Sequence, residues 1–430
     1  MSDGHIARRI SHPETRPVRV LMFGWEFPPH VSGGLGVACE GLVRGLLEIG
    51  VDVTLVLPRP AEAASFPGLR VVVPEPASPR GPSRGSRPRV RRIPIPLRPY
   101  VTRGAGGERR TARWRGEAPG GPYGPDLPRD VLRYAAAAGR IAAREESDVI
   151  HAHDWLTFLA GVEARRSSGR PLVLHVHATE FDRAGSAGDG FVAAVERFGL
   201  AAADRVVAVS RYTADLLERE YDVDPGKLRV VHNAIEPRGE TSRWPSDGTP
   251  VVLFAGRITR QKGPDYFVAA AARVAAERPD VRFVVAGAGD LRSAMMDLVD
   301  GAGLSERFFF PGFLPPEELD RLYARADVFV MPSVSEPFGL AALEALQYGT
   351  PVIVSRAAGV SEVVRHVLRV DYGDVEDLAS KILSVLAFEP LRRTLSARGL
   401  AEVRGLSWRD SATVCVAVYR ELVGESGSAS

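Results

Sequence analysis

Short runs that are apolar at almost every position alternate along the chain with longer Ala-, Leu- and Arg-rich stretches that have helical spacing. Strands buried on both faces show this continuous apolar character, which is typical of parallel sheets covered by helices on both sides. The runs that we predict to be strands are VRVLMFG, VDVTLVLP, DVIHAH, PLVLHVH, DRVVAVS and LRVVHNAI in the first half and PVVLFAGR, VRFVVAGAG, RFFFPGF, DVFVMPS and TPVIVS in the second. The pattern therefore predicts an α/β protein.

One polar, turn-rich stretch divides these strands into two series. It is EPRGETSRWPSDGTP, at residues 236–250. Strands and helices alternate on both sides of it, which predicts two doubly wound, Rossmann-like domains over 18–236 and 249–405. Ligands of such sheets lie at the carboxyl ends of the strands, so we expect the site in a cleft across which the two domains face each other.

The segment 76–128 is crowded with Pro, Gly and Arg. Between residues 80 and 115 it holds twelve arginines and a single acid, Glu108. We interpret it as a long flexible loop, because such a composition buries little apolar surface. The functional alternative is a basic flap that meets an anionic or polymeric partner or the acceptor side of the cleft, with RVRRIPIPL at 89–97 as a strand inside it.

Composition places the chain among globular proteins. Of its 430 residues, 45% are apolar and 25% are charged, and the net charge of +2 gives no sign of nucleic-acid binding. Cys39 and Cys415 lie far apart in apolar sequence, so a disulfide framework is not expected. Residues 1–17 lack the apolar core of a signal peptide, and no run has the roughly 18 apolar residues of a membrane span. We therefore expect a cytoplasmic protein without an integral membrane segment.

Glycines follow two of the predicted strands at positions where a helix begins. In VSGGLG at 31–36, Gly33 and Gly34 allow a ligand to approach the backbone closely. The free amides at the start of the next helix would then face an anion such as a diphosphate. AGAGDLRSAM at 286–295 repeats the arrangement, with tight backbone packing as the alternative reason for its glycines. Neither stretch is a dinucleotide fingerprint, and no GxxxxGK[ST] loop occurs.

A third site combines two cations. LFAGRITRQKGPD places Arg257 just past a predicted strand and Lys262 five residues later, at the start of a helix. Lysine occurs only three times in the chain, so its presence here stands out against a background of arginine. A guanidinium binds phosphate through two hydrogen bonds, whereas an ammonium acts as a point charge. Together they are suited to neutralise a departing diphosphate. The alternative is a pair of solvated surface cations.

The segment SEPFGLAALEAL carries a glutamate near each end. Glu336 precedes the predicted helix, and Glu344 lies inside it with its side chain tilted back toward the helix N-terminus. We expect both carboxylates to reach the same space, around the free amides of Phe338, Gly339 and Leu340. Because carboxylates accept from hydroxyls and amides donate to phosphates, such a pocket is suited to a nucleotide sugar. In the structural alternative, Glu336 caps the helix and Glu344 forms a buried ion pair.

Four histidines lie at the ends of two predicted strands, in HAHDW and HVHATEFD. His151, His153, His175 and His177 alternate with other residues, from which we expect only one of each pair to face a given side. On this interpretation no clustered metal site forms, and no HExxH-type zinc spacing occurs. We therefore expect that the protein uses no metal and no organic cofactor, since the cations of the third site supply the charge that a metal would.

These segments, taken in this order, resemble the two-domain retaining glycosyltransferases of the GT-B fold, in the branch that contains the bacterial and archaeal glycogen and starch synthases. The resemblance runs from about Val18 to Val423 and rests on GWEFPPHVSGGLG, HAHDW, HVHATEFD, AGRITRQKG, GFLPPEELDRLYARADVFVMPS and SEPFGLAALEAL. Glu336 and Glu344 match the paired glutamates of the family. SWRDSATVCVAVYRELV is similar to the family's last helix, which implies that residues 406–423 cross back to the first domain.

The resemblance implies a role for each matching residue. His177 matches the histidine beside the transferring sugar, and Glu336 the glutamate that contacts this sugar. Arg257 and Lys262 match the pair that holds the diphosphate, and these four are the implied catalytic residues. The residues implied for donor binding are Gly33 and Gly34 near the diphosphate, Phe313 with its backbone at the nucleobase, Glu344 at the ribose hydroxyls, and Phe338, Gly339 and Leu340.

The resemblance further implies a retaining hexosyltransferase that takes a nucleotide sugar as donor. The leading hypothesis is glucose transfer from ADP- or UDP-glucose to an α-1,4-glucan, as in a glycogen synthase. A second hypothesis keeps the chemistry and replaces the glucan by a lipid-linked or small-molecule acceptor. A third is a non-catalytic protein that binds a nucleotide sugar. Many family members have a lysine before the two glycines where this chain has Val31 and Ser32, which leaves the choice of donor open.

Overall fold

The structure is a computed structural model that describes residues 16–28, 33–58, 69–73, 127–185, 190–239, 241 and 247–426. Most of the Arg-, Pro- and Gly-rich segment 76–128, including RVRRIPIPL, lies outside the described residues, as do Val31 and Ser32. The two interpretations of that segment therefore stay predictions.

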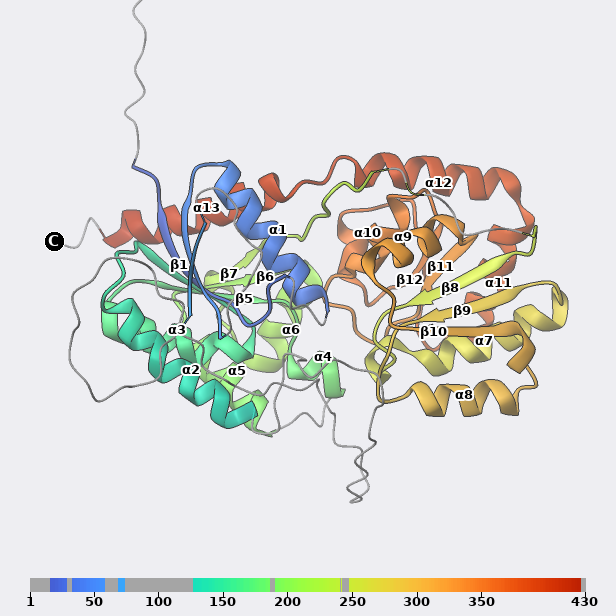
Figure 1. Ribbon diagram of the computed structural model, residues 1–430, viewed down its shortest axis with the longest axis horizontal. Coiled ribbons are helices and arrows are strands. Elements are labelled where there is room, and N and C mark those ends of the chain that lie inside the picture. Colours follow the sequence, from blue (N-terminus) through green and yellow to red (C-terminus); the bar gives the residue numbers. More distant parts are fainter. Residues whose placement is uncertain are drawn as a thin grey trace, which may run out of the picture.

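The first half of the chain forms a parallel sheet of seven strands, in the order β3-β2-β1-β4-β5-β6-β7 (Figure 1). The strands are β1 (Arg19–Phe23), β2 (Asp52–Val56), β3 (Leu69–Val72), β4 (Val149–His153), β5 (Leu172–Val176), β6 (Arg205–Ala208) and β7 (Leu228–Val230). Most of their residues are apolar, and β1, β4 and β5 are buried along almost their whole length. This burial on both faces is the reason that they appear in the sequence as continuous apolar runs.

Helices cover both faces of this sheet. One face is covered by α2 (Leu127–Ala142), α3 (Trp155–Ser168), α5 (Gly190–Ala202) and α6 (Arg211–Tyr221). The other is covered by α1 (Gly34–Glu48) and α13 (Trp408–Ser426), and Cys39 and Cys415 are buried there as free thiols. The short elements are α4 (Glu180–Ala184) and η2 (Pro225–Lys227).

The second half forms a parallel sheet of six strands, in the order β10-β9-β8-β11-β12-β13. These are β8 (Val251–Ala255), β9 (Arg282–Ala286), β10 (Phe308–Gly312), β11 (Val328–Met331), β12 (Val352–Ser355) and β13 (Leu368–Val370). One face packs against α7 (Pro264–Glu277), α8 (Arg292–Gly301), α11 (Val375–Ala387) and α12 (Glu389–Val403). The other packs against α9 (Pro316–Arg325) and α10 (Leu340–Leu346). The single turns are η3 (Arg260–Lys262), η4 (Ser305–Arg307) and η5 (Gly359–Glu362).

Both sheets have the doubly wound topology. The strand order reverses at β1 in the first sheet and at β8 in the second, because later strands add on the far side of each. Ligands of such sheets bind outside the carboxyl ends of the strands at this reversal. The predicted fold class is therefore confirmed, whereas the domain boundaries at 18–236, 249–405 and 406–423 stay predictions.

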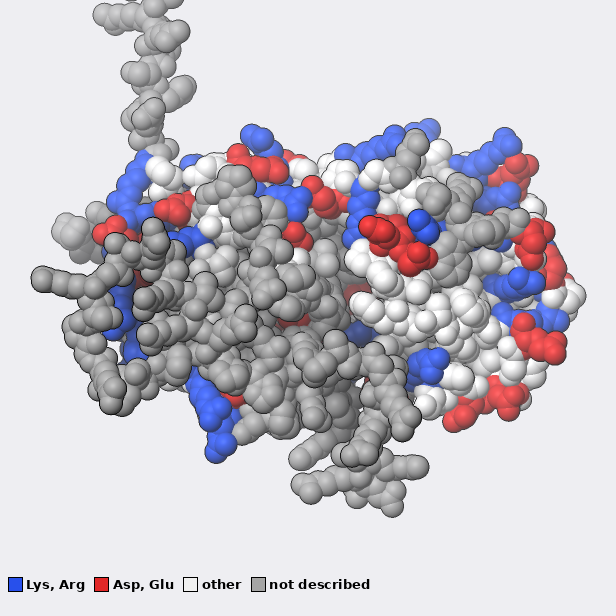
Figure 2. Space-filling view, viewed as in Figure 1, with Lys and Arg blue, Asp and Glu red and all other residues white. Residues whose placement is uncertain are grey.

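Charged side chains of both signs are interspersed on the second half of the molecule, as the face drawn in Figure 2 shows. Across the described residues many of these charges are paired, for example Arg278 with Asp280 at 2.8 Å and Arg393 with Glu389 at 2.6 Å. Such exposed pairs contribute little stability each. No helix in the described part of the chain combines the length and the apolar character needed to cross a bilayer.

The last helix, α13, lies along α1 of the first half (Figure 1). Two glycines of α1 permit this close approach. A Cβ added to Gly41 would lie 2.1 Å from the Trp408 ring, and one added to Gly45 would lie 2.3 Å from the Trp408 carbonyl oxygen. Both distances are far below van der Waals contact. Glycine is therefore required at these two positions by the packing of the two helices.

We predict that Gly45→Ala lowers the thermal unfolding midpoint by roughly 4–8 °C, because overpacking against backbone costs about 2 kcal/mol and outweighs the higher helix propensity of alanine. The matched control is Gly424→Ala on α13, where an added Cβ meets nothing within 4 Å. Its midpoint should not fall. Circular dichroism melting of both variants checks this, and an unchanged midpoint in Gly45→Ala would show that the contact can relax.

Candidate functional site

The two sheets meet through the loops that follow the carboxyl ends of their strands. Ser210, the N-cap of α6, donates from Oγ to the carbonyl oxygen of Pro337 after β11 (2.6 Å). The carboxylate of Glu362, in η5 after β12, accepts from the backbone amides of Arg211 (2.8 Å) and Tyr212 (2.9 Å). A carboxylate at a helix N-terminus is stabilised by the free amides and by the helix dipole. The second half thus caps a helix of the first half.

Further polar contacts cross the same junction. The His232 Nε2 atom lies 2.7 Å from Glu362 Oε2. Burial opposes ionisation of Glu362, but the hydrogen bonds from His232 and from the two amides of α6 outweigh it and lower the pKa of this carboxyl. Ser335 donates its hydroxyl proton to Asp182 (2.5 Å), so the Tyr212 hydroxyl, 2.9 Å away, donates to Ser335. HVHATEFD, which contains Asp182, therefore touches SEPFGLAALEAL.

Glu336 is nearly buried, with 6% of its surface exposed, and its partners come from two neighbouring loops. Its Oε2 atom accepts from the ammonium of Lys262 (2.5 Å) and from the hydroxyl of Ser333 (3.0 Å). Lys262 ends η3, and Gly263 follows with a φ of 64°. A Cβ on Gly263 would lie 2.3 Å from the carbonyl oxygen of Pro332, so glycine is needed for this approach. The structure thus joins Lys262 and Glu336 in an ion pair.

The backbone at the start of α10 leaves amides available. No acceptor is found among the described residues for the amides of Phe338, Gly339 and Leu340. The start of α1 lies against this point, because a Cβ added to Gly34 would be 3.6 Å from Leu340 Cδ1. A Cβ added to Gly33 would meet nothing within 4 Å. The two glycine-rich helix starts, one from each half of the chain, are therefore neighbours.

Glu344, the fifth residue of α10, has partners of its own. Its Oε2 atom accepts from the hydroxyl of Tyr323 (3.1 Å), and its Oε1 atom lies 3.9 Å from the Arg238 guanidinium, which also pairs with Asp320. Burial raises the pKa of Glu344 and outweighs the opposing charge of Arg238. The ion pair of the structural alternative is therefore present. The cap is not, because Gly339 occupies the N-cap position of α10.

Arg257 is exposed in the turn after β8, and its guanidinium makes no hydrogen bond or ion pair with the described residues. The glycines of AGAGDLRSAM lie against this turn. A Cβ on Gly287 would be 1.9 Å from the Gly256 carbonyl oxygen, and one on Gly289 would be 2.2 Å from that of Ile258. These glycines therefore serve tight backbone packing, the alternative to ligand binding, and thereby fix the turn that carries Arg257.

Phe313 follows β10 and is 72% exposed. No hydrogen bond or ion pair among the described residues joins Phe313 or Arg257 to the pair of Lys262 and Glu336. The shared roles of these residues toward one donor molecule therefore stay predictions.

The four histidines lie together on one face of the first sheet, contrary to the expectation from the sequence. The ring centroids of His151 and His153 are 4.4 Å apart, as are those of His175 and His177. His153 pairs in register with His175, with 5.0 Å between their rings. The expectation was wrong because strand side chains alternate with a period of two, so residues two apart share a face. The argument against a histidine cluster therefore fails.

Burial keeps this stack uncharged at neutral pH. It lowers the pKa of His151 and of His177 to about 3, and those of His153 and His175 also fall well below the usual value. His151 Nδ1 lies 2.6 Å from the Tyr419 hydroxyl on α13, and His153 Nδ1 lies 2.9 Å from His177 Nε2. The neutral imidazole of His153 therefore holds the His177 ring in its orientation.

Asp154 is a candidate that the sequence reasoning missed. It follows β4 and has a φ of 57°, and a positive φ is uncommon outside glycine. Its Oδ1 atom accepts from the amides of His177 (2.7 Å) and Ala178 (3.3 Å), and burial raises its pKa to about 6. Strained backbone and a perturbed carboxyl at a strand's carboxyl end are typical of functional sites. The available signal was the aspartate in HAHDW.

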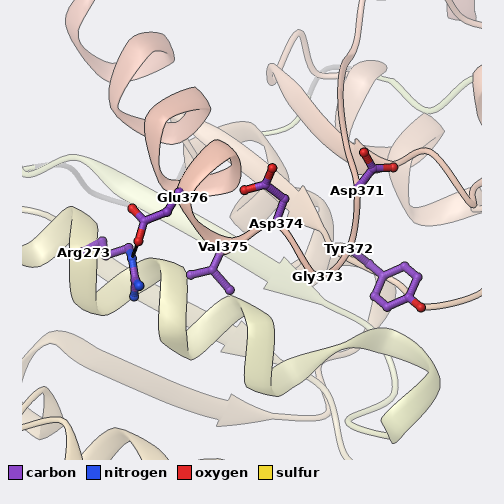
Figure 3. A pocket seen from close by; sticks show the side chains of 7 residues that line it. All are labelled: Arg273, Asp371, Tyr372, Gly373, Asp374, Val375 and Glu376. Atoms are coloured by element: carbon purple, nitrogen blue, oxygen red, sulfur yellow. Dashed lines mark hydrogen bonds and ion pairs between the residues drawn. The ribbon is translucent and has the colours of Figure 1, made fainter.

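A hollow on the surface of the second half involves none of these residues (Figure 3). It is lined by Arg273 of α7, which pairs with Glu376, and by the other residues of 371–376. The carboxylates of Asp371, Asp374 and Glu376 outnumber the single cation, which disfavours an anionic ligand there. The hollow is therefore not a candidate for a nucleotide site.

Three family models match consecutive parts of the chain. The starch synthase catalytic domain matches residues 19–79, glycosyltransferase family 4 matches 99–238, and the group 1 glycosyl transferases match 241–401. These ranges include both sheets.

Relatives match most of the chain. An uncharacterized glycosyltransferase of Methanocaldococcus jannaschii is 30% identical over 81% of this chain and 83% of its own. The α-maltose-1-phosphate synthase of Mycolicibacterium smegmatis is 30% identical over 94% of this chain and all of its own. A D-inositol 3-phosphate glycosyltransferase of Nocardioides sp. is 34% identical over 69% and 71%, and a glycogen synthase of Mycobacterium tuberculosis is 28% identical over 94% of each chain.

Among solved structures, sucrose-phosphate synthase from Thermosynechococcus elongatus is similar, with a TM-score of 0.73 and 23% identity over 95% of this chain and all of that one. At this identity the similarity shows the fold alone, and the fold is GT-B. The family models and the relatives that are at least 30% identical show more. This chain belongs to the group 1 glycosyltransferases of family 4, retaining enzymes with the GT-B fold.

Proposed function

We propose that this protein transfers glucose from ADP- or UDP-glucose to the non-reducing end of an α-1,4-glucan, with retention of the α configuration. The observation that carries the proposal is the pair of Lys262 and Glu336 beside the amides of residues 338–340. A cation and amides suit a diphosphate, and a carboxylate suits sugar hydroxyls. The start of α1, with Gly34 against Leu340, adds further amides from the other half of the chain.

The proposed reaction is a displacement on one face of the sugar. The bond between C1 and the diphosphate oxygen breaks while the acceptor hydroxyl oxygen bonds to C1 from the same side. The hydroxyl proton moves to the departing phosphate oxygen. Lys262 and Arg257 would stabilise the charge that grows on this oxygen, a preorganised electrostatic effect. His177 and Glu336 would contact the sugar, Phe313 the nucleobase and Glu344 the ribose.

One family model and one relative favour a glucan acceptor. The starch synthase model matches residues 19–79, and a relative that matches 94% of the chain is named glycogen synthase. Another relative that matches 94% of the chain is named α-maltose-1-phosphate synthase, whose product is a small sugar phosphate, so it supports a small-molecule acceptor. The D-inositol 3-phosphate glycosyltransferase is closer in identity but matches only 69% of the chain. It supports the second candidate, transfer to a small-molecule acceptor, and a lipid-linked acceptor is a further form of that candidate. A non-catalytic binder is disfavoured because Arg257, Lys262, Glu336 and Glu344 are all present.

We predict that Lys262→Ala and Arg257→Ala each lower kcat by roughly 10²- to 10³-fold while nucleoside diphosphate affinity changes much less, because the charge on the leaving group develops only in the transition state. Steady-state kinetics and diphosphate titration measure the two effects. Lys381→Ala and Arg393→Ala, which remove cations from surface pairs, are the matched controls. Near-normal turnover in Lys262→Ala and Arg257→Ala would remove both residues from the catalytic set.

Glu336→Gln should lower kcat roughly 10²-fold, with the thermal midpoint little changed, because the amide oxygen still accepts from Lys262 and Ser333. Glu344→Gln should mainly raise the KM for the donor, as expected of a residue at the ribose. Glu318→Gln on the surface of α9 serves as the control. If melting shows equal destabilisation in both variants and kinetics show no other change, the two glutamates are structural.

The acceptor is tested with donor labelled in glucose. Each of ADP-, UDP- and GDP-glucose is offered with glycogen, maltose, inositol phosphate or a lipid extract. We expect label from ADP- or UDP-glucose in the polymer, and its release by an exo-hydrolase specific for α-1,4 bonds. Label in the lipid phase or in a small acceptor alone would reject the glucan and retain the glycosyltransferase. No transfer or hydrolysis of any donor, even over excess protein, would favour the non-catalytic binder.

A further inference from the structure

The core of the first half contains five imidazole nitrogens without a hydrogen-bond partner among the described residues. They are Nε2 of His151, Nε2 of His153, both ring nitrogens of His175 and Nδ1 of His177. The first three of these residues are at most 2% exposed. Buried polar atoms are nearly always paired in folded proteins, so a group of orphaned ones at a single place points to a ligand.

Three of these side chains are close enough to share one ion. Ligand nitrogens of His151, His153 and His175 all lie within 4.8 Å of one another. Around a tetrahedral zinc ion with bonds of about 2.0–2.1 Å, two nitrogens are roughly 3.3 Å apart. The rings are also stacked, with 0–26° between their planes, so at least one must turn about its Cβ–Cγ bond to aim its lone pair at a common point. These are side-chain movements that leave the register of β4 and β5 intact.

We propose that His151, His153 and His175 bind one transition-metal ion of the zinc class inside the first half of the chain. Neutral imidazole is a preferred ligand of Zn²⁺ and of the neighbouring ions Co²⁺, Ni²⁺ and Cu²⁺. Two of the rings are already oriented by a contact at the ring nitrogen that would not bind the metal, as metal-binding histidines usually are. His151 contacts the Tyr419 hydroxyl through Nδ1, and His153 contacts His177 through Nδ1, which leaves the Nε2 atom of each for the metal.

The surroundings offer negative charge, which a buried dication needs. Asp154, next to His153, is a buried carboxylate, and the Asp154 and Glu26 charges both act on Cys39. Cys39 forms a second close group with His153 and His177. We assign the three-histidine set because all three of its members are at most 2% exposed and each keeps a ring nitrogen with no partner among the described residues, whereas the second group includes His177, which is only partly buried.

Such an ion would connect β4 to β5 and, through Tyr419, to α13. It would thus brace the strands whose carboxyl ends carry Asp154 and His177. The proposal does not rest on the proposed function, because the three ligands are in the core and the test reads metal content rather than glucosyl transfer. The expectation of no metal came partly from placing these histidines on opposite faces, which the structure overturns.

The test uses the full chain with any purification tag removed. The protein is stripped with a chelator, incubated with Zn²⁺, passed through gel filtration and analysed for metal by mass spectrometry. We expect about one zinc per chain and a higher thermal midpoint than in the stripped protein, since a ligand that binds the native state stabilises it. With Co²⁺, we expect visible absorption bands of a tetrahedral nitrogen site without a thiolate charge-transfer band. Less than about a tenth of an ion per chain in the wild type would overturn the proposal.

Variants then test the ligand set. His153→Gln and His175→Gln should each retain at least roughly tenfold less zinc. Tyr419→Phe removes the hydroxyl that contacts His151 and also Cys415, and it leaves all three ligands in place, so this variant should bind zinc roughly tenfold more weakly. His366→Gln, at a partly exposed histidine of the second half that pairs with Glu402, is the control and should match the wild type. If a variant of a core histidine fails to fold, the zinc content of the wild type and of Tyr419→Phe still tests the proposal. Full zinc content in His175→Gln together with its loss in Cys39→Ser would overturn the assigned ligands.

Discussion

The structure depends on the way the two parallel sheets direct their carboxyl ends toward each other. All strands of a parallel sheet end at one edge, so the loops that follow them emerge on one side of each half. Glu362 of the second half accepts hydrogen bonds from the amides that begin α6, and Ser210 of the first half donates a hydrogen bond to the carbonyl oxygen of Pro337. These hydrogen bonds hold the two halves together, so that Gly34 lies against Leu340 and Asp182 accepts from Ser335. The candidate site is a consequence of this mutual capping.

Within the junction, the nearly buried carboxylate of Glu336 sets the next constraint. An uncompensated charge at that depth is costly, and Lys262 compensates it. An ammonium has three donors, and only one acceptor residue for Lys262 is found among the described residues, so donors are left for a phosphate oxygen. The same lysine can therefore hold the glutamate in place and face a diphosphate. Glu344 is satisfied separately by Tyr323 and Arg238, which is why a carboxylate is tolerated in so apolar a helix.

The sequence was sufficient for the two sheets because continuous apolar runs such as VVLFA and LVLHV report burial on both faces, a property of the strand itself. It was also sufficient to single out Lys262 and Glu336, but not to pair them, since their contact joins residues 74 positions apart. The sequence was also sufficient to place the histidines on one face of the sheet, because residues i and i+2 of a strand point to the same side. Our prediction that they point to opposite sides applied this period wrongly. Asp154 was missed for a different reason: its positive φ and its bonds to the amides after β5 exist only in the folded chain.

The histidine stack raises an energetic question that the glycosyltransferase chemistry alone does not answer. A buried polar atom without a partner costs about 1–3 kcal/mol, so five orphaned nitrogens represent a penalty comparable with the whole stability of a domain. Apolar residues fill the equivalent positions of the neighbouring strands, for example Val207 and Met22, and would avoid that penalty. Only His177, beside the junction, has a proposed part in transfer. The three histidines behind it therefore need a partner of their own, and three neutral nitrogens on two adjacent strands are better suited to a metal ion than to any proton donor that the surrounding apolar core provides.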